Sequence, residues 1–82
     1  MKFTTIYLDE NIIEIHNSIL GKETIFVNNN IVSEKHSFWG AEHNFVINDN
    51  GKDVDCKIKI GFSFNGVVFN LYKDNNPIIV SL

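Results

Sequence analysis

Residues 53–64 read Asp-Val-Asp-Cys-Lys-Ile-Lys-Ile-Gly-Phe-Ser-Phe, with an apolar side chain at every second position. Successive side chains of a β-strand point to opposite faces of a sheet, whereas a helix would spread these residues around its axis. The alternation therefore predicts a half-buried strand, and the glycine near its end indicates a bend or bulge there. The polar side chains between the apolar ones predict a solvated outer face.

Two Asn-Gly pairs flank this stretch and predict hairpin turns, because both residue types tolerate positive φ. A type I′ turn at Asn65-Gly66 pairs Phe64 with Val67, Phe62 with Phe69 and Ile60 with Leu71. A turn at Asn50-Gly51 pairs Ile47 with Val54, Phe45 with Cys56 and His43 with Ile58. Both registers assign the same face of residues 53–64 to the core. The predicted core consists of Phe45, Ile47, Val54, Cys56, Ile58, Ile60, Phe62, Phe64, Val67, Phe69 and Leu71.

The remainder of the chain also indicates strands separated by short turns. Further strands are predicted at 3–8, 12–16, 23–27, from 31, and at 78–82, with turns at 9–11, 28–30 and 74–77. Three consecutive asparagines at 28–30 leave the register open, so the buried face of residues 25–27 is not assigned. About eight short strands predict an all-β, single-domain antiparallel β-sandwich over residues 1–82, or a small barrel, with meander connections.

Size and charge exclude several functions. The chain has 82 residues, 44% of them hydrophobic, which predicts one compact domain with a modest core. A net charge of -3 without any arginine argues against a nucleic-acid partner. No apolar run approaches the length of a membrane span, so we expect no membrane partner. A single cysteine, Cys56, excludes an intramolecular disulfide, and with no export signal the expected compartment is the cytoplasm.

Residues 21–28, Gly-Lys-Glu-Thr-Ile-Phe-Val-Asn, resemble the Fas apoptotic inhibitory molecule family, in which a glycine-lysine pair precedes an apolar strand and an asparagine or aspartate turn. The resemblance spans roughly residues 12–72 and includes Ile13-Glu14-Ile15, Phe38-Trp39-Gly40 and residues 58–66. It implies a small non-enzymatic β-sandwich. The animal members have two such domains and regulate death-receptor signalling, and only one domain is present here.

Candidate catalytic and metal-binding residues are few. His16, His36 and His43 lack partners at the spacing of zinc ligands, so no metal or other cofactor is predicted. The register places His43 on the apolar face, and we expect a histidine at the rim with one bonded nitrogen. Cys56 is expected to be a buried, unreactive thiol. An enzyme would require His43, Cys56 or Glu42 to converge in a cleft, and we predict no enzymatic activity.

The candidate binding residues are Phe38, Trp39, Ile78 and Val80. An exposed aromatic residue beside a sheet edge is a common interface anchor, although Trp39 could instead cap one end of the sandwich. The uncharged segment 78–82 completes a sheet if it is internal, and offers unpaired backbone groups to another chain if it is an edge. The predicted function is non-catalytic interaction with a protein partner or a second copy. The alternative is binding of a small apolar ligand in a hollow between the sheets.

Overall fold

The computed structural model describes residues 2–18, 20–64 and 66–81, and these residues form eight β-strands without a helix. The strands are β1 (Lys2–Leu8), β2 (Asn11–Asn17), β3 (Lys22–Val27), β4 (Asn30–His36), β5 (Glu42–Asp49), β6 (Lys52–Ser63), β7 (Gly66–Lys73) and β8 (Asn76–Val80). The predicted all-β class is confirmed. In the described ranges there is accordingly no helix that could cross a membrane.

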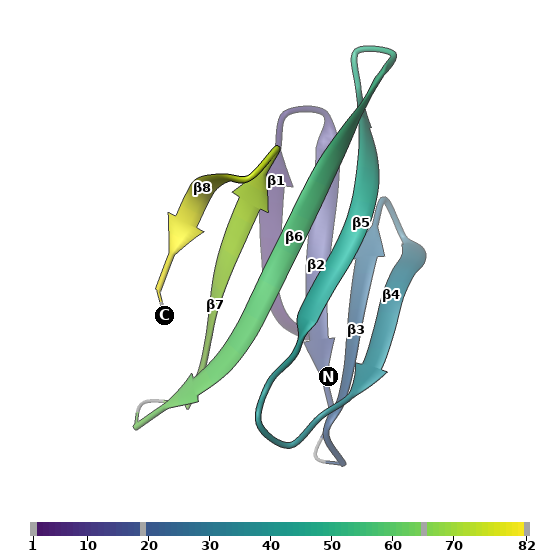
Figure 1. Ribbon diagram of the computed structural model, residues 1–82. Helices are drawn as coiled ribbons and strands as arrows, with labels where there is room; N and C mark the ends of the chain where they lie inside the picture. The colour runs from purple at the N-terminus through teal and green to yellow at the C-terminus, as the bar shows by residue number, and fades with distance from the viewer. Residues whose placement is uncertain (1, 19, 65, 82) are drawn as a thin grey trace.

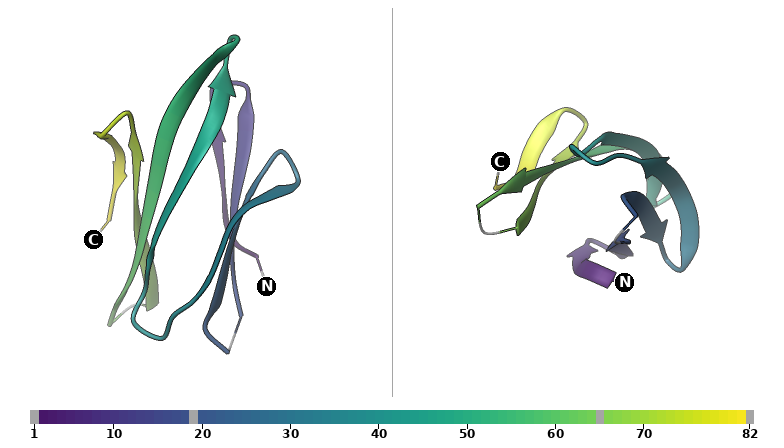
Figure 2. Two further views of the ribbon diagram at one scale, coloured as in Figure 1. Left: turned by 45° about the vertical axis from the view of Figure 1, so that its right-hand side comes forward. Right: turned by 90° about the horizontal axis from the view of Figure 1, so that it is seen from below.

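The strands form two antiparallel sheets of four, ordered β1-β2-β3-β4 and β5-β6-β7-β8 (Figure 1). Every hydrogen-bonded neighbour is also the next strand in sequence, because the connections are too short for any other pairing. The chain passes from one sheet to the other between β4 and β5, which lie side by side. Figure 2 shows the two sheets facing each other, with β1 and β8 as the outer strands on the opposite side.

The core fills the space between the sheets. Isoleucines from β2 and β3 meet alternate side chains of β5, β6 and β7, and several of these residues are fully buried. On the side of β1, the ring of Phe3 packs edge-on against Phe69 of β7, with the ring centroids 5.9 Å apart. The most deeply buried apolar residues are Ile13, Ile15, Ile25, Ile47, Ile58 and Leu71.

The predicted β5–β6 register is confirmed at all three pairs. The φ angles of Asn50 and Gly51 are 53° and 82°, as a two-residue type I′ turn requires. The predicted β6–β7 register is wrong by two residues, because Ser63 pairs with Gly66 and Phe62 with Val67. Asn65 itself lies outside the described residues.

The two-residue shift preserves the buried face but changes which residues reach the core. Ile60 pairs with Phe69 and Ile58 with Leu71, so the end of β6 extends beyond the sandwich. Phe62 is consequently 47% exposed and Phe64 fully exposed, contrary to the expectation that both belong to the core. The turn chemistry favoured the predicted register, because Asn-Gly suits the centre of a type I′ turn, whereas the structure places Gly66 at the start of β7 with a φ of 111°.

Because successive strands run in opposite directions, alternate connections lie at opposite ends of the molecule (Figure 1). The β1–β2, β3–β4, β5–β6 and β7–β8 turns lie at one end, which we call the polar end. Their tight turns need positive φ, and aspartate and asparagine supply it at Asp9, Asn28, Asn29, Asn50, Asp74 and Asn75. The chemistry of these turns therefore makes this end hydrophilic.

Polar contacts tie the two sheets together at the polar end. The amide of Asn11 on β2 donates to the backbone carbonyl of Asn48 on β5 at 2.9 Å. The ammonium of Lys73 lies 2.8 Å from a carboxylate oxygen of Asp9 and 3.3 Å from one of Asp49. These hydrogen bonds, first that to Asp9 and then that to Asp49, raise the pKa of Lys73 above its ordinary value.

The exposed hairpin and the buried strand β7 predict different responses to truncation. Leu71 is fully buried, so Leu71→Ala is expected to lower the free energy of unfolding by about 2–5 kcal/mol. A domain of this size is stabilised by about 4–12 kcal/mol in total, so this loss is large. Phe64→Ala removes no buried surface, so we expect it to change the free energy of unfolding by less than about 0.5 kcal/mol. Urea denaturation measures both, and a large loss for Phe64→Ala would contradict the observed register.

Candidate functional site

The four predicted binding residues are all exposed, but the structure divides them between two surfaces. Phe38 and Trp39 lie in the β4–β5 connection and are 75% and 87% exposed. Ile78 and Val80 lie on β8, at the opposite edge of its sheet from β5. Both Phe38 and Trp39 lie in a loop and not on a strand. Trp39 does not cap the core, because its ring projects into solvent.

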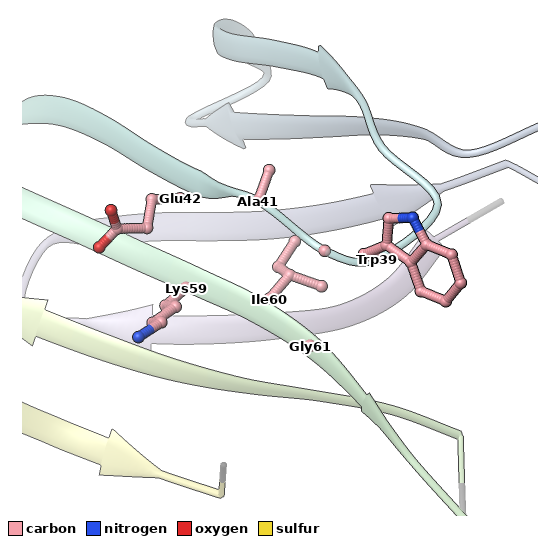
Figure 3. Close-up of a pocket in the computed structure, with 7 residues that line it drawn as sticks. Trp39, Ala41, Glu42, Lys59, Ile60 and Gly61 are labelled. Carbon is pink, nitrogen blue, oxygen red and sulfur yellow. The ribbon is translucent and has the colours of Figure 1, made fainter.

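Trp39 borders an open hollow of about 370 Å³ (Figure 3). The ring lies on one side, whereas Lys59 and Glu42 lie on the other. Ile60 and Ala41 lie between them. Among the described residues, no acidic side chain forms an ion pair with Lys59. The hollow is therefore apolar in the middle, with charged groups along one margin.

Gly40 fixes the position of the Trp39 loop against β6. Its φ is 98°, and a Cβ atom there would lie 2.1 Å from the carbonyl oxygen of Ile60. Only glycine permits so close an approach at this φ. The amide of Ile60 in turn donates to the carbonyl of Ala41 at 2.9 Å. The loop that carries Trp39 is therefore packed directly onto the sheet.

Strand β8 is an edge strand. The sequence had left open whether this segment is internal to a sheet or lies at its edge. It pairs only with β7, and Leu71 lies opposite Ile79. A register shift and Pro77 interrupt the start of the strand, and both features protect edges against pairing. At the other end, Ser81 donates its backbone amide to the side chain of Asn70 at 2.8 Å and exchanges side-chain hydrogen bonds with the backbone of Phe69. The unprotected part of the edge is therefore its central apolar segment.

The main polar feature of the interior is a row of three hydrogen-bonded side chains. His43 Nε2 lies 2.9 Å from Glu23 Oε1, and His43 Nδ1 lies 2.7 Å from Ser33 Oγ. Glu23 and His43 are fully buried. Since Glu23 and Ser33 belong to the first sheet and His43 to the second, the row joins the two sheets. The expectation that His43 is a rim histidine with one bonded nitrogen is therefore wrong. Both of its ring nitrogens form hydrogen bonds in the interior.

A serine, a histidine and a carboxylate in a row are also the elements of a hydrolytic triad. Such a triad requires a substrate site beside the serine. Four hollows in the described part of the chain are lined by other residues. Glu23 Oε2 has no hydrogen-bond partner among the described atoms. We therefore interpret the row as the polar clamp between the sheets.

Glu23 was not singled out in the sequence, although a signal was present. It shares its strand face with Ile25 and Val27, which are both buried. A carboxylate in phase with buried apolar residues requires a buried partner. His43 is in phase with Phe45 and Ile47 in the same way. Matching the two required an assignment of the buried face of β3, which the asparagine turn left open.

The remaining candidate residues do not converge. Cys56 lies opposite Phe45 in the core, and Glu42 points to the outer face of β5. His16 pairs with Glu14 at 2.9 Å on the outer face of β2. Within the described ranges, no group of three histidine, cysteine, aspartate or glutamate side chains could hold a metal ion.

Comparisons with known proteins add no family or function. No family model matches the chain, and neither a curated protein nor a solved structure matches it.

The clamp can be tested with the partly buried Glu14–His16 pair on the outer face of β2 as its control. Glu23→Leu or His43→Leu leaves one buried partner without its hydrogen bond and is expected to lower the free energy of unfolding by about 3–5 kcal/mol. The double variant should cost less than the sum, because neither polar group then remains. Glu14→Leu breaks a pair of the same 2.9 Å length at the surface and should cost less than about 1 kcal/mol. If urea denaturation showed that Glu14→Leu and Glu23→Leu lower the free energy of unfolding equally, the clamp would be disproved.

Burial controls the chemistry of Cys56. Desolvation raises the pKa of its thiol above the ordinary value of 9.0, although the charge of Lys73 lowers it in part. The native thiol should therefore react slowly with Ellman's reagent, and rapidly once urea unfolds the chain. Because the folded-state pKa is raised, the thiol favours folding below pH 9.0 and loses that effect as pH rises further. Cys56→Ala should reduce this alkaline loss of stability, and an unchanged pH profile would contradict the assignment.

Proposed function

We propose that the protein is a non-catalytic interaction domain that associates with a second copy of itself through strand β8. The position of β8 at the edge of the second sheet carries this proposal. The outward-facing amide and carbonyl groups of an edge strand form a template on which another strand can pair. Ile78 and Val80 beside them are 47% and 64% exposed, and together they add apolar surface that a partner strand would cover.

The sequence of β8 suits pairing with its own copy. In an antiparallel arrangement centred on Ile79, Ile78 of one chain lies opposite Val80 of the other. Apolar, β-branched side chains then face each other across the new strand pair. No residue of β8 is charged, so the arrangement brings no like charges together. The sheet would extend from four strands to eight across a twofold axis.

Other observations support an interaction role. A small non-enzymatic β-sandwich is what the resemblance to the Fas apoptotic inhibitory molecule family implies. We place the protein in the cytoplasm, where the buried thiol of Cys56 would stay reduced. The alternative, an apolar ligand between the sheets, has less support, because the space between them is filled by the core side chains.

Light scattering over a concentration series tests the association. The unaltered chain should show a mass that rises toward that of a dimer. Val80→Lys places a charge on the exposed face of β8, removes little buried surface and should give a folded monomer.

Val46→Lys is the matched control. Val46 is 52% exposed on β5, at the other edge of the same sheet, so the substitution has the same chemistry at a distant site. It should leave the dimer intact. A chain that is monomeric at every concentration, or a dimer that both variants disrupt equally, would refute association through β8.

A further inference from the structure

We propose that the end opposite the polar end docks on the surface of a phosphatidylcholine bilayer. Five exposed apolar side chains define this surface, which we call the aromatic end: Leu20, Phe38, Trp39, Phe62 and Phe64. They belong to the β2–β3, β4–β5 and β6–β7 connections and the adjoining end of β6, which lie together at the bottom of Figure 1. Monomeric proteins rarely expose several large apolar side chains in one place without a binding role.

Close contacts join the β2–β3 and β4–β5 connections to each other and to β6. The amide of Ser37 donates to the carbonyl of Gly21 at 2.7 Å, which joins the β4–β5 loop to the β2–β3 turn. A Cβ atom on Gly21 would lie 3.3 Å from the ring of Phe38. On the other side, Gly40 packs against Ile60 of β6, as described above. The backbone of the loop that carries Phe38 and Trp39 is therefore fixed before any binding occurs, which reduces the entropic cost of docking.

A serine in each connection satisfies backbone groups that would otherwise need water. Ser18 Oγ accepts from the amides of Leu20 and Lys22 at 3.3 and 3.1 Å. Ser37 Oγ accepts from the amide of Trp39 at 3.2 Å and donates to the carbonyl of Gly40 at 2.7 Å.

Ser63 Oγ donates to the carbonyl of Gly66 at 3.4 Å in the third connection. A backbone group that is already hydrogen-bonded within the protein loses less when lipid displaces the water around its loop. The serine contacts therefore lower the cost of bringing these loops against a lipid surface.

The distribution of charge gives the molecule an orientation. The turns and strand ends of the polar end carry five acidic residues and two lysines, which together equal the net charge of -3 of the whole chain. These residues are Asp9, Glu10, Asp49, Lys52, Asp53, Lys73 and Asp74. The molecule is 38 Å long, whereas charges are screened over about 8 Å at physiological ionic strength. The acidic residues therefore do not oppose contact of the other end with lipid headgroups.

The shape of the aromatic end favours a lipid over a protein occupant. Leu20, Phe38 and Trp39 are at least 74% exposed and project from loops, and tryptophan side chains in particular concentrate at membrane interfaces. Lys59, beside the Trp39 hollow, has the long side chain that can reach a lipid phosphate while its stem contacts apolar groups. The expectation of no membrane partner rested on the absence of a spanning segment, which surface docking does not need.

Trp39 is the only tryptophan of the chain and reports directly on docking. Adding phosphatidylcholine vesicles to the Val80→Lys protein, in which the β8 association is blocked, should shift the Trp39 emission to shorter wavelength. Phosphatidylcholine with brominated acyl chains should quench it. The protein should also sediment with the vesicles.

Variants of the other loops identify the surface. Leu20→Ser, Phe38→Ser and Phe64→Ser should each weaken vesicle binding about tenfold, since each removes one large apolar group from the contact. Tyr7→Ser is the control, because Tyr7 is 77% exposed at the end of β1 that adjoins the polar turns. It should leave vesicle binding unchanged. Circular dichroism checks that every variant is folded.

Three results would overturn the proposal. The first is a Trp39 emission that does not respond to vesicles. The second is an equal loss of binding for Tyr7→Ser and Phe64→Ser. The third is an emission shift that grows with protein concentration in the absence of lipid, together with a rising mass of the Val80→Lys protein. That last result would assign the aromatic end to contact between copies of the chain.

Discussion

The hydrogen bond between Glu23 and His43 constrains the arrangement of the two sheets. A buried carboxylate is costly without a partner, and this partner lies on the opposite sheet. β3 and β5 must therefore face each other at these two residues. Ser33 of β4 forms a hydrogen bond with the second ring nitrogen of His43. Apolar contacts alone would tolerate a shift of one sheet against the other, but the row of polar side chains does not.

The meander topology divides the remaining chemistry between two ends. Every second connection lies at the same end, so each end is composed of the residues of its own set of connections. At one end, aspartate and asparagine supply the positive φ of tight turns and make that end hydrophilic. At the other end, serine hydroxyls bond the backbone of the connections, and other positions there carry apolar side chains. The two proposed contacts, through β8 and through the aromatic end, use separate parts of this framework.

Local patterning predicted much of the second sheet and less of the first. The alternation in residues 53–64 and the Asn-Gly turn before it gave the β5–β6 register correctly. At the β6–β7 hairpin, two registers that differ by two residues keep the same side chains on the core face. Alternation could not separate them, and Phe62 and Phe64 were assigned to the core although the longer β6 carries them beyond it. For the candidate site, the sequence identified Phe38, Trp39, Ile78 and Val80 but not their division between two surfaces.

The sequence by itself determined the strands, most of their turns and the inward face of the second sheet, because these depend on neighbours within a few residues. Tertiary structure alone decided that β8 is an edge and that Trp39 projects from a loop packed on β6. It also decided that Glu23 finds its partner in His43, 20 residues away on the other sheet. These features depend on how two sheets pack, and the alternation of a strand carries no information about the residue that faces it across the core.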